Sequence, residues 1–296
     1  MSLSPGRVLR DEIADHAPLL LPGVQDALSA RLARRAGFTA GYLSGSATAM
    51  ALLGLPDIGL LTGSELIDQA RRITAAGDLA LVVDADTGFG NAVNVAHTVR
   101  LLEAAGAAGL QLEDQTFPKR CGHFNGKDVV PAQEMLQKIY AATEARRDDD
   151  FVIVARTDAR AVRGLDEAIE RGVSYHQAGA DVIFVEAPQS EAELRQIAKQ
   201  LAAPTLVNVV EEGRTPQLPL AEYGEMGFSV VLYPTAAVRT VARALQDLYG
   251  HLRANGTSAG SPAPMVSFAE RNSINGFDEY EDLAARAANR REQTDE

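Results

Sequence analysis

Two carboxylates stand two residues apart where a run of apolar residues ends. The run Leu81–Val83 leads directly into Asp84, and Asp86 follows. Side chains at positions i and i+2 of a strand share one face, so Asp84 and Asp86 can converge on one point. Two such carboxylates repel each other unless a cation lies between them. A hard divalent ion relieves this repulsion, and Mg²⁺ prefers an all-oxygen shell that includes several waters.

Polar side chains also follow the other apolar runs. Glu113 ends the next run, Asp57 lies in an earlier loop, and the guanidinium of Arg156 suits a carboxylate. Other candidates are the acceptor Glu186, the amide Asn208, and the turn Ser44, Gly45 and Ser46, whose hydroxyls and N–H groups can meet a carboxylate. The set describes a site for an anionic, oxygen-rich small molecule. For any single acid, helix capping or simple solvation is the alternative role. Arg156 can instead form a structural ion pair with an acid of the barrel that is predicted below.

The only cysteine, Cys121, lies in a loop rich in proline, glycine and basic residues, Thr116–Lys127. A single cysteine excludes an internal disulfide. Lys119, Arg120 and His123 stand close enough in the sequence to lower the pKa of the thiol and to ease proton exchange. In a barrel, loops that follow strands lie over the active site, so we predict a lid that carries a catalytic Cys121 to the substrate. Inert packing is the alternative for an isolated cysteine.

The composition restricts the class of protein. The chain has 296 residues, of which 46% are hydrophobic and 23% charged, which is typical of one large globular domain. The formal net charge of -12 argues against a general nucleic-acid or anionic-membrane binder. We find neither a signal-peptide pattern at the start nor an apolar run long enough for a membrane span. These features predict a cytoplasmic protein, and the site residues described above indicate a small carboxylic acid as its substrate.

Short apolar runs alternate with longer amphipathic stretches. The runs are Leu19–Pro22, Gly41–Ser44, Leu79–Asp84, Gly109–Glu113, Phe151–Arg156, Asp181–Glu186, Thr205–Val209 and Val230–Tyr233. Stretches such as 94–105 and 165–178 place apolar residues on one helical face and end at Ala-Gly pairs, where glycine suits a left-handed C-cap. The pattern predicts an α/β protein with a (β/α)₈ TIM-type barrel over residues 1–254, and a doubly wound open sheet is the alternative. Polar groups after nearly every run favour the barrel.

The composition changes after the barrel. Residues 255–262 read as a loop, and a helical segment rich in Ala, Arg and Glu follows over about 267–291. We therefore expect a C-terminal helical tail, residues 255–296, that packs on the barrel or on a neighbouring subunit.

Taken together, the motifs resemble the isocitrate lyase and phosphoenolpyruvate mutase superfamily, and within it the methylisocitrate-lyase-like branch. The resemblance covers about residues 7 to 250, with a weaker match in the tail. It is carried by Ser44–Ser46, Gly54–Asp57, Asp84–Gly90, Glu113–Gln115, Lys119–His123, Ala155–Ala159 and Glu186–Ala187. The Lys-Arg-Cys-Gly-His segment is the most specific of these motifs.

The resemblance implies a (β/α)₈ barrel whose last helix is exchanged between subunits, a homotetramer built from such dimers, and a required Mg²⁺ or Mn²⁺. It implies Asp84 as the direct metal ligand, with Asp57, Asp86 and Glu113 binding largely through waters. The implied substrate contacts are Ser44, Gly45, Ser46, Arg156, Glu186 and Asn208, with Gly122 and His123 closing over the substrate.

The implied reaction is carbon–carbon cleavage of a 2-hydroxy di- or tricarboxylate by a retro-Claisen or aldol-type step. The leading substrate is 2-methylisocitrate, which would give pyruvate and succinate, with Cys121 protonating the carbanion. Tyr42 matches a base proposed in the family; a metal-bound water and Glu186 are the alternatives.

Three features leave the substrate open. Gln111 stands where methylisocitrate lyases usually have His, and the segment 208–216 looks closer to carboxyphosphonoenolpyruvate mutase and to lyases of simpler malates. Arg239 favours methylisocitrate, because a third carboxylate needs a cation. The remaining alternatives are a 2,3-dimethylmalate-type lyase, an oxaloacetate hydrolase or decarboxylase, a phosphonomutase, and a metal-dependent regulatory protein without catalysis.

Overall fold

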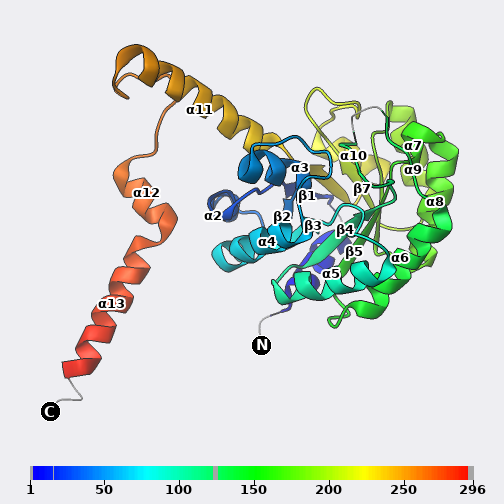
Figure 1. Cartoon of the computed structure of the whole chain (residues 1–296), viewed down its shortest axis with the longest axis horizontal. Coiled ribbons are helices and arrows are strands. Elements are labelled where there is room, and N and C mark those ends of the chain that lie inside the picture. Colours follow the sequence, from blue (N-terminus) through cyan, green and yellow to red (C-terminus); the bar gives the residue numbers. More distant parts are fainter. Residues whose placement is uncertain (1–2, 16, 123–125, 293–296) are drawn as a thin grey trace. The chain divides into compact units, whose positions relative to one another are not determined.

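Eight parallel strands form a nearly closed barrel surrounded by helices (Figure 1). The computed structural model describes residues 3–15, 17–122 and 126–292. The strands are β1 (Leu19–Pro22), β2 (Ala40–Leu43), β3 (Ala80–Asp84), β4 (Gly109–Glu113), β5 (Val152–Thr157), β6 (Val182–Val185), β7 (Thr205–Asn208) and β8 (Val230–Tyr233).

The order of the strands decides between the two predicted folds. The sheet runs β1-β8-β7-β6-β5-β4-β3-β2, so the first strand pairs with the last, and a bridge between Gly23 and Tyr42 links β1 to β2. An open doubly wound sheet does not pair its first strand with its last in this way. The (β/α)₈ prediction is therefore confirmed, and the eight predicted runs coincide closely with the strands.

The helices follow the strands in the predicted alternation. They are α1 (Pro5–Ala14), α2 (Ala27–Arg35), α3 (Gly45–Thr48), η1 (Ala49–Leu53), α4 (Gly63–Gly77), α5 (Ala92–Ala104), α6 (Ala132–Ala145), α7 (Ala159–Val162), α8 (Leu165–Gln177), α9 (Glu191–Gln200), α10 (Leu220–Met226), α11 (Ala236–Asn255), α12 (Phe268–Asn275) and α13 (Phe277–Glu292). Three of these helices, α2, α4 and α5, begin at a capping box whose N-cap residue is Asp26, Thr62 and Asn91, respectively. Gly106 and Gly179 adopt the expected positive φ after their helices.

The apolar side chains of the strands belong alternately to two clusters. One joins alternate residues such as Val82, Val154 and Phe184 inside the barrel, together with Leu9 of α1. The other joins the intervening residues, such as Val83 and Ala155, to the surrounding helices. Side chains alternate along a strand, so the next inward position after each interior residue lies at the carboxyl end of the barrel. That rule places Asp84, Arg156 and Glu186 at one mouth.

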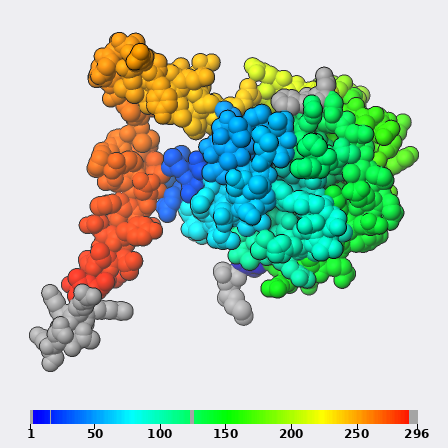
Figure 2. Space-filling model, in the orientation of Figure 1, coloured from blue at the N-terminus to red at the C-terminus, as the bar shows by residue number. Residues whose placement is uncertain are grey.

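The contacts within the chain separate two compact units, Met1–Arg239 and Thr240–Glu296. The first unit holds the barrel. In the second, the chain from α12 to α13 forms a narrow rod (Figure 2), and the large side chains of Phe268, Phe277, Tyr280 and Leu283 are exposed. The boundary predicted at 254/255 and the packing of the tail on a neighbour stay predictions. Within the described residues, no helix is both long and apolar enough to cross a membrane.

Candidate active site

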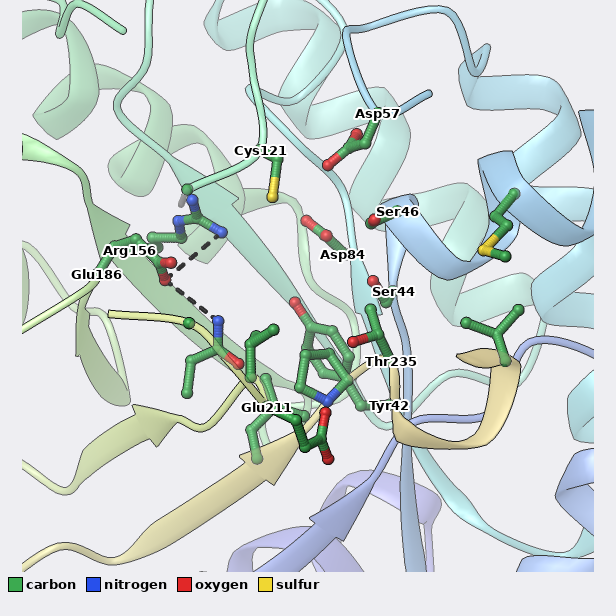
Figure 3. A pocket seen from close by; sticks show the side chains of 18 of the residues that line it. Tyr42, Ser44, Ser46, Asp57, Asp84, Cys121, Arg156, Glu186, Glu211 and Thr235 are labelled. Atoms are coloured by element: carbon green, nitrogen blue, oxygen red, sulfur yellow. Dashed lines mark hydrogen bonds and ion pairs between the residues drawn. The ribbon is translucent and has the colours of Figure 1, made fainter. Parts of the chain in front are cut away.

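A cavity of about 460 Å³ opens at the carboxyl ends of the strands (Figure 3). Most of the predicted site residues line it: Tyr42, Ser44, Ser46, Asp57, Asp84, Lys119, Arg120, Cys121, Gly122, Arg156, Glu186, Asn208 and Arg239. Three others, Gly45, Asp86 and Glu113, are buried but do not line it. His123 lies outside the described residues.

Asp84 is held at the end of β3 by three donors. Its Oδ2 accepts from the Gly45 N–H at 3.1 Å, and its Oδ1 accepts from Gln111 Nε2 at 3.0 Å and from the Asp86 N–H at 3.3 Å. A Cβ on residue 45 would lie 3.2 Å from Asp86 Oδ1 and 3.3 Å from Asp84 Oδ2, so glycine permits this close approach. The sequence suggested that the Gly45 N–H contacts substrate; in the structure it orients Asp84.

Lys119 from the cysteine loop lies among the acids. Its side chain is 4% exposed; Nζ donates to Asp57 Oδ1 and lies 2.8 Å from Asp86 Oδ1. Desolvation lowers the pKa of Lys119, but the carboxylates of Asp86 and Glu113 outweigh it and raise this pKa above its usual value. Burial in turn raises the pKa of Asp86 to about 7, although Lys119 opposes the shift. Lys119 thus supplies positive charge to the carboxylates.

The acidic residues fit a hydrated divalent ion. Glu113 is 1% exposed, its Oε1 has no hydrogen-bond partner among the described residues, and burial raises its pKa well above the usual value. A cation nearby would stabilise the ionised carboxylates. Within the described part of the chain, no three such side chains already gather as a metal-binding group. Because Mg²⁺ keeps several waters, one direct ligand with others acting through water suits this arrangement.

A buried hydrogen-bond chain connects Tyr42 to Asp84. The Tyr42 hydroxyl donates to Gln111 Oε1 at 2.7 Å, and Gln111 Nε2 donates onward to Asp84 Oδ1. Burial, reinforced by the charge of Asp84, raises the pKa of Tyr42 well above its usual value. The Asp84 carboxylate therefore orients the Gln111 side-chain amide, with its NH2 group toward Asp84. The amide oxygen then faces Tyr42 and accepts the hydrogen bond from its hydroxyl.

Arg156 and Asp158 form a buried ion pair at the end of β5. Arg156 Nε and Nη2 donate to the two carboxylate oxygens of Asp158 at 2.9 and 3.1 Å, and Lys127 Nζ donates to Asp158 Oδ1 at 2.6 Å. Burial raises the pKa of Asp158, but Arg156 and Lys127 outweigh it and lower this pKa to about 2. Arg156 also lies 3.8 Å from Glu186 Oε2. The sequence suggested either a substrate contact or a structural pair for Arg156, and the structure contains the pair at the cavity wall.

The cysteine loop reaches into the cavity. The Cys121 N–H donates to Asp57 O at 3.3 Å, and Gln115 exchanges two hydrogen bonds with the backbone of Arg120. Lys127 Nζ donates to the carbonyl oxygen of Gly122. Cys121 is half-buried and its sulfur lies on the side of the cavity where Asp57 and Asp84 lie (Figure 3). These contacts agree with the predicted position of the loop over the site.

Glu211 and Thr235 lie at the other end of the view from Cys121 (Figure 3). Here Arg239 pairs with Glu211 and Glu212, which follow β7. Sequence reasoning assigned no role to these two acids, although the rule that polar residues follow the strands selects them. It also missed Asp158, which the same rule would have found, and Lys127, for which the sequence contains no signal.

Comparisons with known proteins agree with the geometry. The family described as phosphoenolpyruvate phosphomutase matches residues 9–253. The 2,3-dimethylmalate lyase of Eubacterium barkeri is 44% identical over 93% of this chain and 95% of its own length. The 2-methylisocitrate lyase of Escherichia coli (strain K12) is 47% identical over 87% and 88%.

Solved structures agree as well. A crystal structure of 2,3-dimethylmalate lyase superposes with a TM-score of 0.91 at 34% identity, over 97% of this chain and 96% of that one. A phosphonopyruvate hydrolase in complex with oxalate and Mg²⁺ superposes with a TM-score of 0.85 at 31% identity, over 96% and 99%.

The barrel, its cavity and these relatives define an α/β-barrel enzyme of the lyase class. The chain belongs to the phosphoenolpyruvate mutase/isocitrate lyase superfamily, whose match spans most of its length. The resemblance seen in the sequence is thereby confirmed.

Proposed function

We propose that this lyase uses a divalent metal to cleave a carbon–carbon bond of a 2-substituted malate or isocitrate, releasing pyruvate and a second carboxylate. The observation that carries the proposal is the presence of Asp84 and Cys121 in one cavity. Asp84 would serve there as a metal ligand and Cys121 as a proton donor to carbon. The names of the relatives support two substrates, 2-methylisocitrate and 2,3-dimethylmalate.

Asp84 would hold Mg²⁺ or Mn²⁺ directly, with Asp57, Asp86 and Glu113 acting through waters. The ion would supply Lewis acidity at the 2-oxygen of the substrate. Lys119 already balances part of the charge of these carboxylates, so its ammonium would assist in holding the acids together.

The remaining side chains would bind the substrate and move its protons. Arg156 would bind a substrate carboxylate, and Ser44, Ser46, Gly122 and Asn208 would contact the other oxygens.

Glu186 is the proposed base for the 2-hydroxyl proton, because its carboxyl group lines the cavity whereas the Tyr42 hydroxyl already donates to Gln111. As the bond between C2 and C3 breaks, its electron pair stays on C3 and C2 becomes a carbonyl carbon. Cys121 Sγ then donates its proton to C3. Arg120 and His123 are proposed to ease the return of a proton to the thiolate.

A pyruvate-release assay tests the proposal. The chain is incubated with 2-methylisocitrate and 2,3-dimethylmalate, whose cleavage gives pyruvate, and with isocitrate, whose cleavage gives glyoxylate, in Mg²⁺ and in excess chelator. Oxaloacetate is included as a control, because pyruvate from it reports decarboxylation. We expect Mg²⁺-dependent release of pyruvate from at least one 2-alkyl substrate. Release of neither pyruvate nor glyoxylate from the first three substrates would exclude the lyase, and equal release in chelator would exclude the metal.

We further propose a cytoplasmic homotetramer built from dimers that exchange their C-terminal helices. The exposed apolar side chains of α12 and α13 support a partner surface for this tail, because residues such as Phe268 and Phe277 gain stability when buried. The single cysteine, which needs no oxidising compartment, supports the cytoplasm.

A further inference from the structure

Asp114 is fully buried just beyond the end of β4 and is not among the residues that line the cavity. Its carboxylate accepts four hydrogen bonds, from the end of β5 and from α8. Oδ1 accepts from the Asp158 N–H at 2.9 Å. Oδ2 accepts from Thr157 Oγ1 at 2.7 Å, from the Tyr175 hydroxyl at 2.9 Å and from Arg171 Nη1 at 3.1 Å. The carboxylate therefore links the end of β5 to α8.

The main chain of Asp114 is hydrogen-bonded on both sides as well. Its N–H donates to the Arg156 carbonyl oxygen at 3.3 Å, and its carbonyl oxygen accepts from the Val130 N–H at 2.8 Å. Arg171 Nη1 also donates to the carbonyl oxygen of Val130 at 2.9 Å. Asp114 thus joins three elements: the end of β5, helix α8 and the segment that follows the cysteine loop.

These contacts continue to the cavity through Asp158. Asp114 fixes the backbone N–H of Asp158, and the Asp158 carboxylate accepts from Arg156 Nε and Nη2 at 2.9 and 3.1 Å. The same carboxylate accepts from Lys127 Nζ, which also donates to the carbonyl oxygen of Gly122 in the cysteine loop. A shift of the Asp158 backbone would therefore displace both the Arg156 guanidinium and the part of the loop at Gly122.

We propose that Asp114 is a positioning residue that sets, through Asp158, where the Arg156 guanidinium and the Cys121 thiol lie in the cavity. For its effect on turnover the inference rests on the proposed function. Asparagine cannot replace the carboxylate, because it has one acceptor oxygen and its NH2 group would face at least one of the four donors. Two donors that face each other would move the end of β5, and a displacement of about 1 Å costs about 100-fold in rate.

The test compares Asp114→Asn with Asp181→Asn. Asp181 is the matched control, because its carboxylate also accepts from arginines, Arg10 and Arg146, and from a backbone N–H of β5, that of Ile153, but near the start of this strand instead of its end. We expect the urea midpoints of both variants to fall. Only Asp114→Asn should lower kcat/KM for pyruvate release, by about 100-fold, with a raised KM and a reduced kcat.

A second measurement does not need turnover. Cys121 is the only cysteine and is half-buried, so its rate of alkylation by iodoacetamide reports the surroundings of this one thiol. We expect Asp114→Asn to raise this rate about tenfold and Asp181→Asn to leave it unchanged, because only the first variant loosens the cysteine loop. Thr157→Val removes one donor to Asp114 and should give a smaller rise, whereas Thr157→Ser keeps the hydroxyl and should retain the original rate.

The outcomes separate this inference from the proposed reaction. An Asp114→Asn variant that matches Asp181→Asn in either kcat/KM or alkylation rate would overturn the positioning role, since Asp114 would then act on stability alone. If Asp114→Asn does not fold, the two Thr157 variants decide, and equal alkylation rates for them count against the role. Absence of pyruvate release from the unmodified chain counts against the lyase, whereas the alkylation rates still decide the role of Asp114.

Discussion

At the residue scale, burial controls what each charged side chain of the cavity can do. Lys119 was predicted to activate the thiol of Cys121, but its ammonium pairs with Asp57 and Asp86. A buried ammonium needs such partners, because an isolated charge in the interior is strongly disfavoured. The positive charge of Lys119 therefore stabilises mainly these carboxylates. This leaves Cys121 to act through its position, at the cavity and beside Asp57.

Replacing Cys121 with Ala tests the proton donor. We expect kcat to fall by about 10²- to 10⁴-fold, because a positioned acid contributes that much to proton transfer, while substrate affinity is retained. Steady-state kinetics and calorimetric titration measure the two quantities. Unchanged turnover would show that another group protonates the carbon.

Replacing Asp158 with Asn tests the buried ion pair. The amide leaves Arg156 and Lys127 without their carboxylate, so we expect the free energy of unfolding at pH 7 to fall by about 3 kcal/mol. The pKa of Asp158 is about 2 in the folded protein and 3.8 is its ordinary value, so the carboxylate stabilises the fold above about pH 4. This contribution is lost as the pH falls from about 4 to about 2.

Urea titrations between pH 7 and pH 3 measure this effect. The difference between the chain and Asp158→Asn should narrow below about pH 4, since protonation makes the two side chains similar. A difference that stays constant across this range would contradict the assigned pKa direction.

At the scale of the elements, the inward-facing positions at the strand ends and one loop together form the site. The inward positions of β3, β4, β5 and β6 continue beyond the interior apolar layer as Asp84, Glu113, Arg156 and Glu186, respectively. Hydrogen bonds in parallel register hold these ends level; Glu113, for example, lies opposite Arg156. The cysteine loop approaches these strand ends closely at Gly122, where an added Cβ would lie 2.5 Å from both Arg156 Nη2 and Glu186 Cδ.

Gly122→Ala tests the close approach of this loop. A Cβ there would lie 2.5 Å from Arg156 Nη2 and closer still to Glu186 Oε1, so either the loop or the ends of these two side chains must shift. We expect kcat/KM to fall by about 100-fold, since a displacement of about 1 Å of a reacting group costs that much. The control is Gly250→Ala on α11, where a Cβ meets no atom within 4 Å. Equal activity of the two variants would show that the close approach at Gly122 does not matter for turnover.

At the scale of the whole molecule, the barrel unit contains every described residue of the proposed site. The described ranges place these residues between Tyr42 and Arg239, the last residue of the first unit. The second unit exposes large apolar side chains instead. We therefore propose that the first unit carries out the reaction and that the second unit mediates association between subunits.

Truncation after Asn255 tests that role. Removal of α12 and α13 deletes Phe268, Phe277, Tyr280 and Leu283, whose burial would stabilise an assembly. We expect light scattering to report a tetramer for the full chain and a smaller species for the truncated one. The same mass for both would contradict the proposed helix exchange.

Periodicity and residue type were sufficient to predict the barrel, the polar strand ends and the position of Cys121 at the cavity, because each depends on neighbours along the chain. The tertiary structure alone decided the partners. Lys119 meets an acid 62 positions away, Tyr42 meets Gln111 69 positions away, and Arg239 meets Glu211 28 positions away. A sequence pattern reports which face a side chain occupies. The charged partner of that side chain, and how far the pair is buried from water, depend on how strands and loops distant in the sequence come together. This is why Arg239 suggested a substrate carboxylate in the sequence, whereas in the structure its partners are Glu211 and Glu212.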